Sequence, residues 1–219
     1  MNMRVFFFAA AGVLTFLAAA RAAQPELPPF NATLLENRLT VNGVTPRGGV
    51  ALLIVSRDES SERWPVVNEQ HERLRDEDGD GVATFDFPAV PPQFTVVGVV
   101  DESDGRAVVV TPGPDFGRLP ETAFAGDGAG RPLRFSSLSR FAHAMLVRPG
   151  KGVWTSALMD GSLDDVDGLA DQRSTLEFRR MKQKDGGLQG PEHLLPHDTL
   201  VVIDTLNLKA FASTVREQP

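Results

Sequence analysis

Short apolar runs alternate with polar turns along most of the chain, a pattern that predicts strands rather than helices. Eight runs are rich in Val, Ile, Thr, Ala and Phe and are bounded mainly by Gly, Pro and Asp: residues 50–55, 82–87, 94–100, 107–110, 142–147, 174–178, 199–203 and 209–214. β-branched and aromatic residues favour pleated sheet, whereas Gly, Pro and Asp favour turns. The predicted class is therefore all-β, with a turn roughly every 8 to 12 residues, as in a β-sandwich.

The polarity inside these runs separates half-buried strands from fully buried ones. Residues 83–87 (Ala-Thr-Phe-Asp-Phe) and 173–178 (Arg-Ser-Thr-Leu-Glu-Phe) alternate between apolar and polar, so we expect one face of each to contact solvent. Residues 96–100 and 200–203 are continuously apolar apart from Gly98, which predicts burial on both faces.

The two halves of the chain repeat each other. A shift of 91 positions superposes residues 84–87 on 175–178, Asp76 on Asp167, and Asp80 on Asp171. Trp64 and Trp154 differ by 90 positions, and residues 99–101 match 202–204 at a shift of 103. The second half has therefore gained 12 residues, which we assign to the polar, Gly-rich stretch 182–193. A chance match of a few strand residues is the alternative.

This repeat predicts two tandem immunoglobulin-like β-sandwich domains, each close to the size of one such module. Domain 1 spans residues 34–112 and domain 2 spans 133–219, joined by a Gly/Pro-rich linker at 113–132 and preceded by a Pro-rich lead-in at 23–33. We expect Trp64 and Trp154 to fill equivalent core positions, because a large aromatic in a small domain is usually packed. An exposed, sugar-stacking role is the alternative.

Residues 1–22 have the features of a secretory signal peptide. Arg4 precedes an apolar run at residues 5–20, and Ala20-Arg21-Ala22 forms a small-residue cleavage box, so we predict cleavage after Ala22. The alternative is an uncleaved anchor, but the run is shorter than the roughly 20 apolar residues that span a bilayer. The predicted location is secreted or periplasmic.

Charge and composition narrow the function further. The chain has 22 basic and 29 acidic residues, and removal of Arg4 and Arg21 leaves a net charge of −9. Such a charge disfavours nucleic acid and anionic membranes as partners. The sequence contains no Cys, which excludes disulfides, thiolate nucleophiles and thiolate metal sites. Export without cysteine favours a bacterial envelope protein.

One passage resembles a known family. Asp80-Gly81 leads into residues 83–87, then Val90-Pro91-Pro92 and residues 94–97. This passage of strand, Pro-Pro and strand resembles carboxypeptidase-regulatory-like and related bacterial immunoglobulin-like domains over about 20 residues of the first half. Gln93 stands where that family has Gly, and the second half lacks these prolines. The resemblance implies an accessory β-sandwich module without catalysis, and it assigns no functional residues.

The strongest local motif for chemistry is an acidic run at residues 76–81. Asp76, Asp78 and Asp80 occupy positions 1, 3 and 5 of a calcium loop and Gly81 occupies position 6, but position 12 is Phe87 instead of an acid. Two interpretations follow. One is a weak calcium site in a β-loop, completed by Asp58, Glu59 or Glu62. The other is a solvated hairpin turn, for which Asp-Gly is typical.

A second acidic loop lies in the second half. The aspartates of this loop are so close in sequence that their carboxylates repel one another unless solvent or a cation screens them. We therefore predict a second calcium site here too. Its candidate ligands are Asp164, Asp165, Asp167 and Asp171.

Residues 101–105 are interpreted as a hairpin turn. His71 and His143 are isolated in sequence, and prolines keep His193 and His197 from forming a helical zinc pair.

These features predict an exported, non-catalytic structural, adhesion or binding protein of the bacterial cell envelope, with an unknown protein or glycan as its partner. The sequence contains none of the common nucleophile, phosphate-binding or zinc-hydrolase motifs. The alternative is a carbohydrate-active or other hydrolase, or its accessory module, that uses the acidic loops. A pocket joining carboxylates from both halves would favour that alternative.

Overall fold

A computed structural model describes residues 28–58, 66–112, 133–136, 142–159, 173–176, 179–180 and 195–215. Within these ranges every regular element is a strand, every pairing is antiparallel, and the strands form three sheets. The predicted all-β class is therefore confirmed. The same ranges contain no helix with the length and apolarity needed to cross a membrane.

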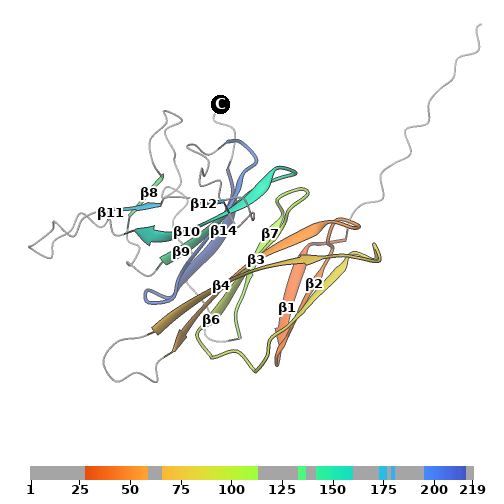
Figure 1. Ribbon diagram of the computed structural model, residues 1–219, viewed down its shortest axis with the longest axis horizontal. Coiled ribbons are helices and arrows are strands. Elements are labelled where there is room, and N and C mark those ends of the chain that lie inside the picture. The colour runs from red at the N-terminus through yellow and green to blue at the C-terminus, as the bar shows by residue number, and fades with distance from the viewer. Residues whose placement is uncertain are drawn as a thin grey trace, which may run out of the picture.

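The first half of the chain builds two sheets. The smaller one has the strand order β1-β2-β5, from β1 (Asn31–Leu35), β2 (Arg38–Asn42) and β5 (Val82–Asp86). The larger one has the order β4-β3-β6-β7, from β3 (Gly49–Asp58), β4 (Val66–Arg75), β6 (Thr95–Asp101) and β7 (Ala107–Val110). Figure 1 shows the smaller sheet on one side of the larger.

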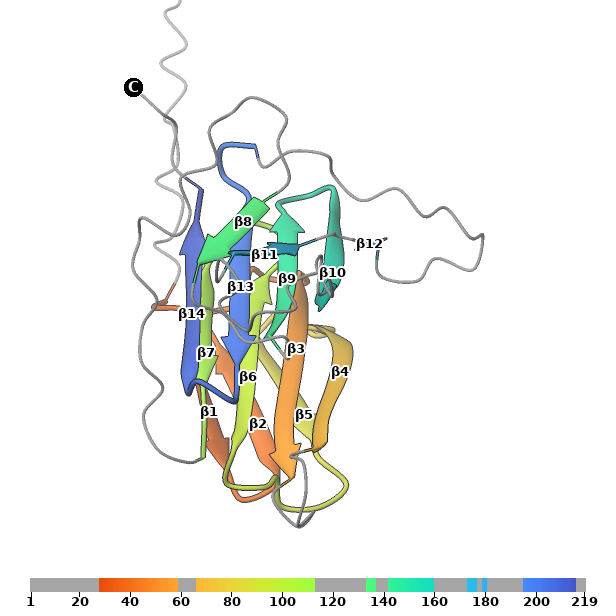
Figure 2. The same cartoon turned by 90° about the vertical axis from the view of Figure 1, so that its left-hand side faces the viewer.

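The second half builds the third sheet, in the order β14-β13-β9-β10-β11-β8 with β12 paired to β10. Its strands are β8 (Leu133–Ser136), β9 (Ala142–Arg148), β10 (Gly152–Met159), β11 (Arg173–Leu176), β12 (Arg179–Arg180), β13 (Thr199–Asp204) and β14 (Lys209–Thr214). In Figure 2, β8 and β11 cross in front of β9 and β13, so the sheet folds back over its own outer face.

Two hydrophobic cores hold the three layers together. Side chains that alternate along β3 and β6 point to opposite faces of the middle sheet. On one face, Leu52, Ile54, Val97 and Val99 pack against Leu39 and Val41 of the small sheet. On the other face, Leu53, Val55 and Val96 pack against Met145, Val201 and Ile203 of the third sheet. The middle sheet is therefore covered on both sides.

This arrangement confirms the burial predicted from the continuous apolar runs. Every residue of β6 and of β13 is buried. The alternation predicted for residues 83–87 is also confirmed, because Ala83 and Phe87 are buried while Thr84 and Asp86 are exposed. The apolar strands β6 and β13 thus lie inside their sheets, whereas the alternating strand β5 lies in the outer, small sheet. The alternation predicted for residues 173–178 lies outside the residues whose side chains are described.

Each of the eight predicted runs overlaps a strand, although residues 177–178 of one run lie outside the described residues. The described residues also form six strands that were not predicted: β1, β2, β4, β8, β10 and β12. β1 begins at Asn31, inside the predicted Pro-rich lead-in of 23–33. β4 escaped prediction because its sequence is V-V-N-E-Q-H-E-R-L-R, and its polar side chains reflect its place at the edge of the middle sheet.

The strand pairings of the two halves follow the same order. The pair β2-β5 and the series β4-β3-β6-β7 correspond in chain order and pairing to β8-β11 and β10-β9-β13-β14. One pairing differs, because β10 also pairs with β11, whereas β4 and β5 lie in separate sheets. The register agrees with the sequence repeat at its shift of 103: Val100 pairs with Ala107, and Ile203 pairs with Ala210. The two halves therefore share a pairing scheme as well as a sequence pattern.

The register also bears on the two tryptophans. Val55 pairs with Glu69, and the corresponding Val147 pairs with Val153, so Trp154 occupies the position of Gln70. The ladder thus does not align Trp154 with Trp64, which lies outside the described residues. Trp154 itself is only 8% exposed, as predicted for a core residue, and the Arg148 guanidinium lies 5.5 Å from the centre of its ring.

Candidate metal-binding loops

The predicted calcium run follows β4 and crosses from the middle sheet to β5 of the small sheet. It is therefore not a hairpin turn, because β4 and β5 do not pair with each other. Gly79 and Gly81 adopt φ values of +82° and +83°, a left-handed conformation that glycine enters without steric cost. The glycines of the motif are thus explained by the path of the backbone.

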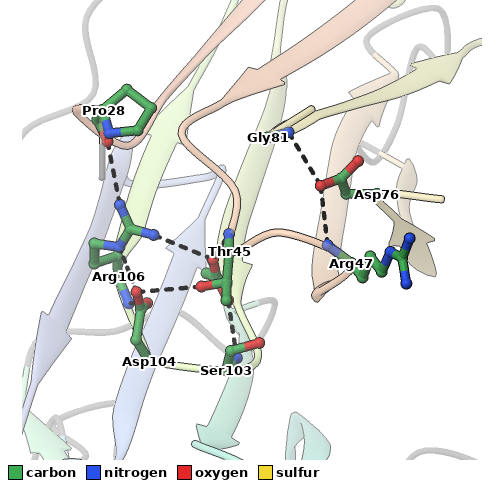
Figure 3. A network of polar contacts seen from close by, with 9 residues as sticks. Pro28, Thr45, Arg47, Asp76, Gly81, Ser103, Asp104 and Arg106 are labelled. Atoms are coloured by element: carbon green, nitrogen blue, oxygen red, sulfur yellow. Dashed lines mark hydrogen bonds and ion pairs between the residues drawn. The ribbon is translucent and has the colours of Figure 1, made fainter. Parts of the chain in front are cut away.

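Asp76 is fully buried at the start of this loop and closes it through its carboxylate. Its Oδ2 accepts hydrogen bonds from the backbone N–H groups of Arg47, at 3.0 Å, and Gly81, at 3.1 Å, as Figure 3 shows. Its Oδ1 accepts a third from Gly79 N, at 2.9 Å. Burial raises the pKa of Asp76, but the three donors lower it by more, so the pKa lies below its usual 3.8. The carboxylate is charged at neutral pH.

Asp78 and Asp80 are exposed and lie next to Asp76. Asp78 Oδ1 accepts a hydrogen bond from Asp80 N, at 3.2 Å, and Asp80 Oδ1 accepts one from Val82 N, at 2.8 Å. One carboxylate oxygen of each of the three aspartates lies within 4.8 Å of the others. The structure therefore brings together the three residues that the sequence predicted as calcium ligands, at a spacing that one cation can bridge.

The sequence predicted that Asp58, Glu59 or Glu62 would complete the calcium site at Asp76, Asp78 and Asp80, but the structure places Asp58 far from it. Gly49 pairs with Arg75 beside this loop, whereas Asp58 pairs with Val66 at the other end of the ten-residue strand β3. At about 3.3 Å per residue, Asp58 lies roughly 30 Å from Asp76. The prediction that Asp58 completes the site is wrong. Glu59 and Glu62 lie outside the described residues.

The second predicted calcium loop also lies outside the described residues. Asp164, Asp165, Asp167 and Asp171 all fall between β10 and β11, in the segment 160–172. Their proposed role as calcium ligands therefore stays a prediction from sequence spacing.

Buried aspartates close other loops in the same way as Asp76. Asp101 accepts hydrogen bonds from Thr45 N, at 2.7 Å, and Ser103 N, at 2.8 Å, beside Arg106. It begins the turn between β6 and β7, which confirms the predicted hairpin at 101–105. Its counterpart Asp204 accepts two hydrogen bonds from Asn207. Closing loops is thus a shared role of strand-end aspartates, and it explains Asp76 without a metal.

A cluster that the sequence did not reveal lies between the middle and third sheets. Glu69 and His71 of β4 meet His143 of β9: Glu69 Oε2 lies 2.8 Å from His143 Nδ1, and Glu69 Oε1 contacts His71 Nε2. Burial raises the pKa of Glu69, but hydrogen bonds from the two imidazoles, together with their charge interactions, lower it to about 2. The two histidines are 72 positions apart, and without a predicted β4 nothing in the sequence joined them.

Compared with known proteins, the chain matches no family model, no curated protein and no solved structure.

Proposed function

We propose that this is an exported, non-catalytic structural or binding protein of the bacterial cell envelope, made of two immunoglobulin-like modules packed through facing sheets. The observation that carries this proposal is the repeated strand order. In the first half, a β1-β2-β5 sheet packs on a β4-β3-β6-β7 sheet, which gives seven antiparallel strands in two layers, the strand number of a constant-type immunoglobulin domain. Six strands of the second half repeat these pairings, with β10 additionally paired to β11.

The roles of the described acidic residues favour a module over a hydrolase. A retaining or inverting glycosidase needs two carboxyl groups on either side of a substrate cleft. Here the buried aspartates of the strand ends, Asp76, Asp101, Asp198 and Asp204, each accept a hydrogen bond from a backbone N–H group. Carboxylates used in this way close loops, which serves stability instead of proton transfer.

Weak calcium binding at Asp76, Asp78 and Asp80 is part of the proposal. The support is the convergence of three carboxylate oxygens within 4.8 Å, since oxygen donors suit a hard cation. A second calcium site at Asp164, Asp165, Asp167 and Asp171 is proposed from the sequence repeat. Because Asp76 already accepts three hydrogen bonds, we expect the affinity of the first site to lie in the weak extracellular range of about 10⁻⁴ to 10⁻³ M.

The proposal is tested by fractionating cells of the native host and by assaying the purified mature protein. We expect the exported fraction to contain a protein that begins at Ala23. We also expect retention on an envelope glycan or an envelope protein, with no turnover of chromogenic glycoside or ester substrates. Hydrolysis that disappears in an Asp78→Asn, Asp80→Asn double variant would instead establish the hydrolase alternative. A cytoplasmic, unprocessed chain would contradict the export proposal.

A further inference from the structure

The cluster of Glu69, His71 and His143 lies at the junction of the two halves. β4 belongs to the middle sheet, which the first half builds. β9 belongs to the third sheet, which the second half builds. Glu69 and His71 lie two residues apart on β4, so they share the strand face of Val67, which packs against the core between these sheets. The side chains of Glu69, His71 and His143 are 22%, 21% and 13% exposed. The cluster is therefore close to solvent but mostly enclosed.

We propose that Glu69, His71 and His143 form a binding site for a borderline transition-metal ion of the Zn²⁺ class, which links the two halves of the protein. Two imidazole nitrogens and one carboxylate are a donor set that zinc takes in proteins, with water completing the coordination. Calcium and magnesium prefer oxygen donors only, so this site selects a different class of ion from the aspartate loop. The proposal rests on this cluster alone and is independent of the proposed function.

The contacts show how an ion would enter. Each imidazole nitrogen faces a different oxygen of the same carboxylate, so the carboxylate occupies the space between the two rings. Turning the Glu69 carboxyl about its terminal torsion, which is soft, directs one oxygen to an ion held between the rings. Binding therefore requires a rearrangement of Glu69 and a closer approach of the two rings.

His71 can present a lone pair at Nε2 when its proton moves to Nδ1. Its Nδ1 is buried and has no hydrogen-bond partner, while the Glu69 carboxylate favours the proton on Nε2, so the metal-binding tautomer gives up this hydrogen bond in exchange for the ion. With the proton on Nε2, the ring donates to Glu69. With the proton on Nδ1, Nε2 becomes a metal ligand, and Nδ1 is without a partner in both tautomers.

The surroundings of the cluster add no competing cation at the site. On β4, the next residue on the same face is Arg73, and it forms an ion pair with Glu102 of the β6–β7 turn. The strands beside His143 contribute Ile203 and Ala157 at the paired positions. Among the described residues, the groups that contact the Glu69 carboxylate are therefore the two histidines, and these are the ligands that would bind the ion with it.

The test uses the untagged mature protein after removal of metals with a chelator. Calorimetry with zinc should show one ion per chain at this site. At a free zinc concentration of 100 times the dissociation constant, the unfolding equilibrium should shift about 100-fold, which raises the melting temperature by roughly 5 to 10 °C. Calcium at the same concentration should not reproduce this shift.

Variants locate the site. His71→Gln and His143→Gln should each weaken zinc binding at least about tenfold. His197→Gln is the matched control and should leave zinc binding unchanged. His197 is exposed and precedes the first residue of β13, whereas His143 pairs with Ile203 near the other end of that strand. The Asp78→Asn, Asp80→Asn variant should also leave it unchanged. Zinc binding that persists in His143→Gln would overturn the proposal.

A measurement on the unaltered protein covers the case in which a histidine variant does not fold. The chain has four histidines, whose imidazole signals can be followed by NMR during a zinc titration. The signals of His71 and His143 should shift together and saturate at one equivalent, ahead of those of His193 and His197. Shifts confined to His193 and His197, or no shift at all, would refute the site.

Discussion

Replacing Gly98 with Ala tests whether the middle and third sheets are packed as tightly as the structure shows. Gly98 lies at the centre of β6, where its backbone has no positive φ, so alanine fits the local conformation. A Cβ atom at this position would lie well within 3.0 Å of Val201 Cγ1 and 3.4 Å from Val201 Cβ. The effect of Gly98→Ala is therefore steric and is directed at one residue of the opposing sheet.

The expected loss follows from two opposing effects. Forcing an extra methyl group into a packed core costs about 1 to 3 kcal/mol, and the fully buried centres of two sheets have little room to adjust. Alanine also restricts the unfolded chain, which returns about 0.4 to 1 kcal/mol. The net destabilisation should be about 1 to 2 kcal/mol, which lowers the melting temperature by roughly 2 to 8 °C for a chain of this size.

A double-mutant cycle with Val201→Ala separates this clash from a general weakening of β6. Val201→Ala alone removes buried methyl groups and should cost about 2 kcal/mol. It also removes the atom that the methyl group introduced by Gly98→Ala would strike. The double variant should therefore be more stable than the sum of the single losses by at least about 1 kcal/mol, measured by urea unfolding. Additive losses, or a neutral Gly98→Ala, would refute the packing of the two sheets.

Three further predictions concern other parts of the molecule. Trp154→Ala should cost about 3 to 5 kcal/mol, and unchanged melting in differential scanning calorimetry would show that the ring is not packed as the structure has it. Calcium at ten times a millimolar-range dissociation constant should stabilise the protein by about 1.4 kcal/mol. The double variant Asp78→Asn, Asp80→Asn should remove the part of this stabilisation that the first loop contributes. Identical melting in calcium and in chelator would contradict a calcium site. A hydrogen bond from Arg38 holds the pKa of Asp86 below its usual 3.8, so this pair stabilises the fold at neutral pH and loses its contribution as the pH falls through that lowered value. Arg38→Gln should therefore flatten the acid limb of the stability curve, and an unchanged limb would show that the exposed pair contributes nothing.

The sequence was sufficient for β5, β6 and β13 because the burial pattern of these strands is encoded locally. The apolar residues of β6 and β13 and the alternation of β5 identify these strands without knowledge of their neighbours. β4 could not be found in this way, because an edge strand pairs on one side and its charged side chains need no apolar partner. The sequence also could not predict how the two halves stack, because burial of both faces of the middle sheet does not tell which layer covers each face.

The candidate site shows the same division between local and distant information. Asp76, Asp78 and Asp80 lie within one turn, so their spacing was enough to predict that their carboxylates converge. Asp58 was expected nearby because it is near in sequence, but an extended strand of ten residues carries it to the opposite end of the sheet. His71 and His143 meet through the packing of separate sheets, a contact that no spacing within one segment encodes.

The double coverage of the middle sheet sets an order of events during biosynthesis. Its strands are complete once β7 ends at residue 110, but the sheet that covers their second face is complete only when β14 ends at residue 214. At roughly 5 to 20 residues per second, about 100 residues of synthesis separate the two moments by roughly 5 to 20 s. Throughout that interval Leu53, Val55, Val96 and Val100 form an apolar face with no partner layer. A nascent chain of this design therefore needs a holdase, or a delay in the folding of its first half, until its last strand has emerged.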